Sequence, residues 1–319
     1  MVIQTEDNEI FALVGPSCTY KSNMAIDLAS KYPFEVISAD SRLIYTGMDI
    51  GTSKPTKEER KVVPHHLIDL VEPSCNYSVA LYKNEAEEKT QNILLRRKIP
   101  LFVGGTGLYL NSVLLGLTIP EVKPDVSFRR QLKQYSQKEL YKNLKELDPR
   151  ATEIIHENDN FRTIRALEVI YKTNKLYSRL RTVRSLPFNV KWIGLTYQDR
   201  KLHSELIEKR AFSFCGNGLI DEVKELLKKY GELELFKKTI GYAEVLDFLT
   251  NNNMKLEEVI QKITLHTKQL VKRQMTWFRA NKKISWIYLD NISYKEALDR
   301  VFNLIEEGSL ANTSRVSIS

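Results

Sequence analysis

The feature that most constrains the fold is a short apolar run followed by a glycine turn and a helical pattern. Residues 10–15 (IFALVG) are rich in strand formers, and apolar residues recur at helical spacing from Lys21 to Lys31. A Gly-Pro turn separates the two segments. This order predicts a strand and a helix joined by a tight turn at the edge of a sheet.

The same alternation continues along the first third of the chain. FEVISAD (34–40) and IPLFVGG (99–105) are apolar runs that end in small or acidic residues, and a helical pattern covers residues 79–97 between them. Successive strands joined by helices pair in parallel, because each crossover returns the chain to the same end of the sheet. The pattern therefore predicts an α/β fold with a parallel sheet flanked by helices.

The alternation of strand and helix patterns stops at Pro120 and Pro124, which precede a charge-rich stretch with helical periodicity. We interpret this stretch as a mostly helical domain inserted into the sheet-forming core. The predicted boundaries are 118–199 for the insertion and 1–117 with 200–319 for the core.

Strand and helix patterns return in the last third of the chain. KWIGLTY (191–197) and SWIYLD (285–290) resemble strands. Further helical patterns follow at 199–214, 218–230, 240–250 and 256–280. The final ten residues, 310–319, are small and polar and are expected to fray.

The net charge of +8 is concentrated in two segments that contain no acid. Residues 169–198 carry six lysines and arginines, and residues 259–289 carry seven. A solvated helix usually mixes both signs, whereas one-signed segments that include Trp192, Trp277 and Phe278 suit a polyanion with bases that stack. Composition alone leaves two interpretations open, a nucleic-acid partner or a basic face that binds nothing.

Several classes of protein are disfavoured by simple patterns. No run approaches the ~18 apolar residues of a membrane span, so we expect a cytoplasmic protein without membrane contact. The cysteines Cys18, Cys75 and Cys215 are scattered without C-x-x-C spacing, which favours neither disulfides nor zinc. His65 and His66 are adjacent and would point to opposite faces of a strand, so a structural role is favoured over a metal site.

The segment GPSCTYKS (15–22) occupies the first strand-to-helix turn, where backbone N–H groups and the helix dipole favour an anion. Lys21 would contact phosphate oxygens, and the Ser22 hydroxyl is placed to bind Mg²⁺. The phosphate-loop consensus has glycine where this chain has Tyr20, and a positive φ there would cost a tyrosine about 1–2 kcal/mol. On this motif alone, a phosphate site and a plain turn both remain open.

Seven segments together resemble a known family. In chain order they are GPSCTYKS, ADSRLIYTGMDIGTSKPT (39–56), VPHHLIDLVEPSCNYSVALY (63–82), VGGTGLYL (103–110), ENDNFRTIRALEVI (157–170), IGYAEVLDFL (240–249) and KRQMTWFR (272–279). Their order and spacing resemble the tRNA dimethylallyltransferase family over nearly the whole chain. The resemblance implies a P-loop NTPase-like fold and a monomer that moves a dimethylallyl group from dimethylallyl diphosphate to the N6 amine of an adenosine beside the anticodon of tRNA, with Mg²⁺ as cofactor.

The resemblance also implies roles for single residues. Asp40 matches the general base, Thr106 matches a hydroxyl in the reaction channel, and Arg210 matches an arginine that reaches the diphosphate. The segment that matches the diphosphate site comprises Gly15, Pro16, Ser17, Cys18, Thr19, Tyr20, Lys21 and Ser22, with Ser22 also matching the metal ligand. The residues alone leave other roles open, namely a magnesium-shell carboxylate or helix N-cap for Asp40, a surface helix position for Arg210, and a simple turn for Gly104-Gly105.

Three parts of the chain match family segments that contact tRNA. Asp40, Ser41, Arg42 and Leu43 form a DSRQ-like segment for the adenosine, in which Leu43 replaces an amide whose loss could weaken base discrimination by about 1–3 kcal/mol. Contacts with the anticodon stem-loop are implied for Phe161, Arg162, Thr163, Ile164, Arg165, Lys272, Arg273 and Arg279. Trp277 falls on the apolar stripe of its helical pattern and is expected in the core.

Three rival interpretations share parts of this pattern. A P-loop small-molecule kinase would share the sheet and the Lys-Ser pair, and an adenylate prenyltransferase would act on free AMP. The basic segments disfavour both. A catalytically impaired tRNA-binding relative is motivated by Tyr20 and Leu43, which replace glycine and glutamine of the family pattern.

Overall fold

The computed structural model describes residues 9–251 and 253–313. The chain forms two compact units, one made of Met1–Leu110 with Pro187–Ser319 and the other of Asn111–Leu186. The second unit ends earlier than the predicted 118–199, because the segment Asn189–Thr196 is a strand of the sheet in the first unit.

Within the described residues, the first unit contains a sheet of six strands in the order β3-β2-β4-β1-β5-β6. The strands are β1 (Glu9–Val14), β2 (Phe34–Ser38), β3 (His65–His66), β4 (Ile99–Gly104), β5 (Asn189–Thr196) and β6 (Ile284–Tyr288). Every pair is parallel, so the parallel α/β fold predicted from the alternation of strands and helices is confirmed. The carboxyl ends of all six strands lie at one edge, where ligands bind in folds of this kind.

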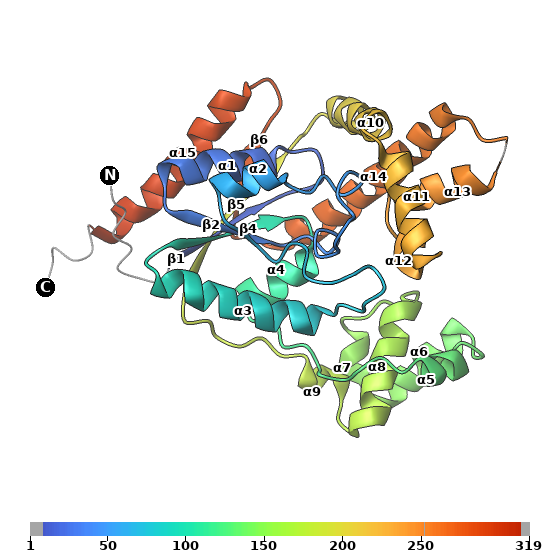
Figure 1. The fold of residues 1–319 in the computed structure, drawn as a ribbon. Coiled ribbons are helices and arrows are strands. Elements are labelled where there is room, and N and C mark those ends of the chain that lie inside the picture. The colour runs from blue at the N-terminus through green and yellow to red at the C-terminus, as the bar shows by residue number, and fades with distance from the viewer. Residues whose placement is uncertain (1–8, 252, 314–319) are drawn as a thin grey trace, which may run out of the picture. The chain divides into compact units, whose positions relative to one another are not determined.

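Helices cover both faces of the sheet (Figure 1). α1 (Lys21–Lys31) and α15 (Tyr294–Thr313) lie on one face, and α3 (Val79–Leu95) lies on the other. The side chains of Met24 and Val301 join β1 in one buried cluster. α1 spans the segment predicted to be helical, because its apolar residues recur with the helical period and face this cluster.

The rest of the first unit is helical and has a core of its own. The helices around this core are α10 (Arg200–Gly216), α11 (Leu219–Tyr230), α12 (Glu234–Lys237), α13 (Tyr242–Thr250) and α14 (Leu256–Arg279), whereas α2 (Lys57–Val62) has no buried side chain. Leu219, Phe236 and Tyr242 are fully buried among them. The four predicted helices of this region are confirmed. The predicted fraying is wrong for residues 310–313, which continue α15, while residues 314–319 lie outside the described part.

The second unit is built from short capped helices. α4 (Gly107–Leu114) leads into it, and α5 (Val126–Leu132), α6 (Gln137–Leu147), α7 (Pro149–Thr152), α8 (Asn160–Thr173) and α9 (Tyr177–Leu180) follow. Ser136 and Glu139 form a capping box at the start of α6, and Leu144 and Leu167 are fully buried in the core. In the parts of both units that the structure describes, no helix is long and apolar enough to cross a membrane.

Candidate active site

The loop between β1 and α1 is held in an unusual backbone conformation. Gly15 approaches β5 so closely that a Cβ atom there would lie 2.2 Å from the carbonyl oxygen of Leu195. Cys18 and Tyr20 both adopt the left-handed region, with φ of 63° and 58°. The position at which the phosphate-loop consensus has glycine therefore does have a positive φ. Tyr20 occupies it, and a non-glycine residue in this conformation costs about 1–2 kcal/mol of backbone strain.

Two cations converge on this loop from different elements. The Lys21 Nζ atom at the start of α1 donates to the Pro16 carbonyl at 2.5 Å. Nη1 of Arg210, on α10, lies 3.7 Å from the Cys18 sulfur, and its guanidinium lies over the Phe214 ring. Burial, together with the neighbouring Arg210 charge, lowers the pKa of Lys21 to about 8. The loop therefore faces a concentration of positive charge that an anion would relieve.

Asp40 and Thr106 follow neighbouring strands, β2 and β4. Asp40 Oδ1 accepts the Arg42 backbone N–H at 2.8 Å, and Thr106 Oγ1 accepts the Ser41 N–H at 3.1 Å. Gly104 permits this arrangement, since a Cβ there would lie 2.2 Å from the Ala39 carbonyl oxygen. Among the described residues, no protein group bonds the second oxygen of Asp40, which is left for a ligand.

A cavity of about 480 Å³ joins these elements. Nine of the predicted site residues line it, namely Ser17, Cys18, Thr19, Tyr20, Lys21, Ser22, Asp40, Leu43 and Arg210. The structure thus brings together, on one cavity, a carboxylate, two cations and a loop rich in backbone N–H groups. Thr106 lies one hydrogen bond away, on the backbone of Ser41.

Two polar residues that the sequence argument did not single out hold the loop in place. Gln274 of α14 connects the loops that follow β1 and β4. Its Oε1 accepts the Ser17 N–H at 3.0 Å, and its Nε2 donates to the Gly105 carbonyl at 3.1 Å. His203 of α10 is buried, and its Nε2 lies 2.8 Å from the Ser17 carbonyl oxygen. Burial lowers the pKa of His203. Gln274 lies in the segment KRQMTWFR (272–279), between basic residues on which the prediction of RNA contacts rested.

The remaining residues implied to contact tRNA fall into groups with different surroundings. Phe161 is 73% exposed, and Arg162 on the same helix is exposed. Thr163 and Ile164 are buried. Arg165 donates to Glu168 and to the carbonyls of Pro120 and Val122. In this segment, Phe161 and Arg162 are the side chains best placed for an external partner.

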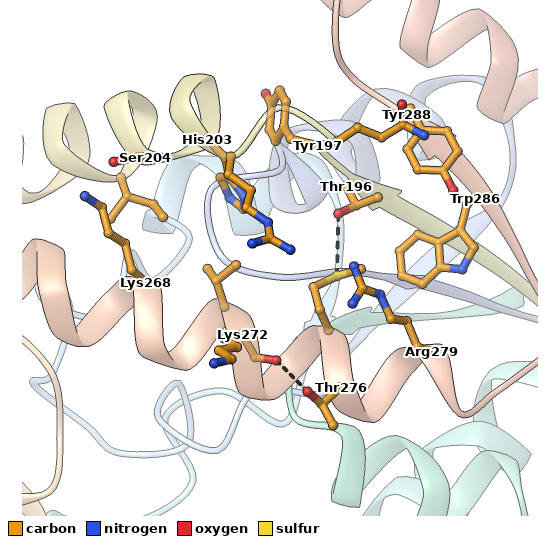
Figure 2. A pocket seen from close by; sticks show the side chains of 15 residues that line it. Thr196, Tyr197, His203, Ser204, Lys268, Lys272, Thr276, Arg279, Trp286 and Tyr288 are labelled. Carbon is orange, nitrogen blue, oxygen red and sulfur yellow. Dashed lines mark hydrogen bonds between the residues drawn. The ribbon is translucent and has the colours of Figure 1, made fainter.

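On α14, Lys272 and Arg279 line a second cavity (Figure 2). Arg273, on the same helix, is exposed. Trp277 is half-buried and packs on Gly107, where a Cβ would lie 2.0 Å from its ring. The fully buried aromatic of this motif is Phe278, so the core side of the helix is centred one residue later than predicted.

The adjacent histidines have ordinary structural partners. His65 Nδ1 lies 2.8 Å from the Val63 carbonyl oxygen, and His66 Nε2 lies 2.8 Å from a Glu35 carboxylate oxygen. Burial lowers the pKa of His65. Both contacts tie the short strand β3 to its surroundings.

Comparisons with known proteins give one family. A family model described as IPP transferase matches residues 43–281, and one described as isopentenyl transferase matches residues 8–69. A tRNA dimethylallyltransferase of Caldanaerobacter subterraneus subsp. tengcongensis is 40% identical over 307 residues, which cover 93% of this chain and 97% of that protein.

Solved structures agree with the sequence comparisons. The tRNA isopentenylpyrophosphate transferase of Bacillus halodurans is 34% identical with a TM-score of 0.71, and the match covers 98% of this chain and 100% of that one. A eukaryotic dimethylallyltransferase acting on tRNA gives a TM-score of 0.78 at 26% identity, with 94% and 80% covered.

Proposed function

The chain belongs to the IPP transferase family, and from this premise we propose that it transfers a dimethylallyl group from dimethylallyl diphosphate to the N6 amine of an adenosine beside the anticodon of tRNA. The observation that carries the proposal is the convergence of Asp40, Lys21 and Arg210 on one cavity. A prenyl transfer needs a base for the amine and cations for the leaving diphosphate. The cavity supplies both.

Asp40 acts as the general base in this proposal. The N6 amine is conjugated with the adenine ring and is a weak nucleophile, so its proton must leave as the new bond forms. The N6–C1 bond forms, the C1–O bond to diphosphate breaks with its electron pair on oxygen, and the amine proton passes to Asp40. The Arg42 N–H holds Oδ1, which leaves Oδ2 to face the amine.

The phosphate loop and Arg210 receive the leaving diphosphate. Lys21 and Arg210 supply positive charge where negative charge develops, and the N-terminus of α1 adds its dipole. Gln274 and His203 position the loop by fixing both backbone groups of Ser17. Thr106 holds the segment after Asp40 through the Ser41 N–H.

The donor set of the cavity fits Mg²⁺. The described residues contain no group of three or more acidic, histidine or cysteine side chains that could form a metal cage. Mg²⁺ instead favours one or two protein oxygens completed by substrate phosphates and water, and Ser22 and Asp40 provide such oxygens at this cavity. We propose Ser22 as the protein ligand, where Mg²⁺ would neutralise diphosphate charge.

The acceptor is proposed to reach the cavity past the segment Asp40, Ser41, Arg42 and Leu43. Phe161, Arg162, Lys272, Arg273 and Arg279 are the proposed contacts with the anticodon stem-loop, since their side chains are exposed or line an open cavity. We propose that the enzyme acts on tRNA in the cytoplasm and as a monomer.

Nucleoside analysis of tRNA after incubation with dimethylallyl diphosphate and Mg²⁺, without ATP, tests the proposal. We expect N6-isopentenyladenosine in the tRNA and none in an incubation with AMP as acceptor. In a parallel incubation with ATP in place of dimethylallyl diphosphate, phosphate transfer would identify a kinase if the first incubation gives no prenylation. Binding of tRNA without any product would identify an impaired relative, as the tyrosine at position 20 and the leucine at position 43 would allow.

A further inference from the structure

A second cavity, of about 650 Å³, lies at the carboxyl ends of β5 and β6, between α10 and α14 (Figure 2). This volume is within the range of sites that hold small ligands. His203 forms part of its wall and also bonds the Ser17 carbonyl of the phosphate loop. The two cavities are therefore neighbours. Of the residues that line the second cavity, only His203, Lys272 and Arg279 have a role in the proposed function.

The charge of this cavity has one sign. Its lining includes Arg200, Lys268, Lys272 and Arg279 and no acidic residue. None of these four side chains has an ion pair or a side-chain hydrogen bond with any residue in the described ranges. All four are exposed residues, so their charged groups reach solvent as well as the cavity. Unpaired cations around a hollow create a positive potential that an anion would relieve.

Aromatic side chains face the cations across the cavity. Figure 2 shows Trp286 and Tyr288 on β6, and Lys268 and Lys272 on α14. Tyr288 is 43% exposed and Trp286 is half-buried, so both rings can be reached from solvent through the cavity. Cations beside exposed rings match a ligand that carries both a phosphate and a base able to stack.

We propose that this cavity is a subsite for one nucleotide of the acceptor RNA strand, with a phosphate among the four cations and the base against Tyr288 or Trp286. The inference rests on the proposed function and adds a binding site to it. β5 is three strand positions from β2, which precedes Asp40, and at about 4.8 Å per strand the separation is about 14 Å. One RNA strand can reach both places.

A strand of RNA fits better than a free nucleotide because the acid-free segment 259–289 carries further exposed cations outside the lining of the cavity. Arg273, Lys282 and Lys283 extend the segment without acids, and none has a carboxylate within 4 Å among the residues the structure describes. A mononucleotide would fill the cavity and leave these cations unused. A polymer would use both.

The first experiment measures the salt dependence of RNA binding. A labelled anticodon stem-loop is titrated with the enzyme in the absence of dimethylallyl diphosphate, using the wild type and the double variant Arg200→Ala/Lys268→Ala. Loss of two phosphate contacts should lower the slope of log affinity against log salt by about 1 to 2. The matched control, Lys61→Ala/Lys98→Ala, removes two exposed lysines away from the cavity and should leave the slope unchanged. A wild-type slope in the cavity variant overturns the proposal.

The second experiment tests the base. Tyr288→Ala should weaken stem-loop binding about 5-fold or more, and Tyr288→Phe should retain affinity, because stacking needs the ring and not the hydroxyl. AMP serves as the free-nucleotide probe. One outcome is that AMP binds the wild type but not Arg200→Ala/Lys268→Ala, while the stem-loop binds both with the same affinity. The cavity would then be a mononucleotide site, and the RNA proposal would be overturned. Because binding is read without the donor, failure of prenylation leaves this test intact.

Discussion

The two cavities at the carboxyl edge of the sheet differ in whether their charged side chains already contact other protein groups. In the cavity of the phosphate loop, Lys21 already bonds Pro16, Arg210 contacts Cys18, and Asp40 is held by Arg42. In the cavity between α10 and α14, the cations have no protein partner within the described residues. Groups fixed in advance suit a reaction, whereas free cations on long side chains suit a polyanion that approaches from solvent. Substitutions in the first cavity should therefore change turnover and donor binding, and substitutions in the second should change RNA affinity.

The largest expected effect is that of Asp40→Asn. Asparagine keeps the acceptor oxygen for the Arg42 N–H but cannot take the amine proton, so single-turnover prenylation should slow by about 10²- to 10⁴-fold. The affinity for tRNA should stay near that of the wild type. Unchanged turnover would show that Asp40 is not the base. A parallel loss of tRNA affinity would show that residues of the first cavity also contribute to RNA binding.

Gln274→Ala should have the next largest effect. The substitution removes two hydrogen bonds that hold Ser17 and Gly105, each worth about 0.5–1.5 kcal/mol, so kcat/KM for dimethylallyl diphosphate should fall about 10-fold or more. The RNA affinity should change little, which distinguishes positioning of the loop from an RNA contact. Gln269→Ala, at an exposed position of the same helix, is the control and should behave as the wild type.

The pH dependence of donor binding should report Lys21. Its pKa in the free enzyme is lowered to about 8, so the ammonium charge is present below pH 8 and is lost as the pH rises through that value. The KM for dimethylallyl diphosphate should rise with pH above about 8, by at most about tenfold per pH unit. Lys21→Arg keeps its charge and should flatten the profile. A wild-type profile that is already flat to pH 9.5 would show that the charge of Lys21 does not bind the donor.

The first cavity could be predicted from the sequence more fully than the second for a physical reason. The strand, loop and helix from Glu9 to Lys31 are local, and hydrophobic periodicity specifies them. Gln274 acts on backbone groups 257 and 169 positions away, at Ser17 and Gly105, which no local pattern encodes. The second cavity likewise combines residues from β5, α10, α14 and β6.

The sequence pattern of two helices, α15 and α14, contained more information than the predictions used. Ala297, Val301 and Ile305 recur every four residues and face the main core, so α15 could have been predicted from the same periodicity that predicted α1. On α14 the stripe was assigned to Trp277, although Phe278 is the buried residue. An error of one residue rotates the assigned face by about 100° around the helix, which moves Trp277 from the core to a half-buried position beside it.

The smallest expected effect is that of Tyr20→Gly, which asks whether the ring belongs to the loop or to the donor pocket. Glycine would remove about 1–2 kcal/mol of backbone strain, but it would also lose the edge-on contact with Tyr294, worth about 0.5–1.5 kcal/mol, and make the unfolded chain freer by about 0.5–1 kcal/mol. These contributions offset one another, so the free energy of unfolding should change by less than about 1 kcal/mol and turnover should be retained. Tyr294→Leu removes the ring contact together with the hydrogen bond from the Tyr294 hydroxyl to Asp27, and Tyr294→Phe, which removes only that hydrogen bond, completes the control. A sharp rise in donor KM at unchanged stability would instead make the exposed Tyr20 ring, which lines the cavity, a contact for the donor.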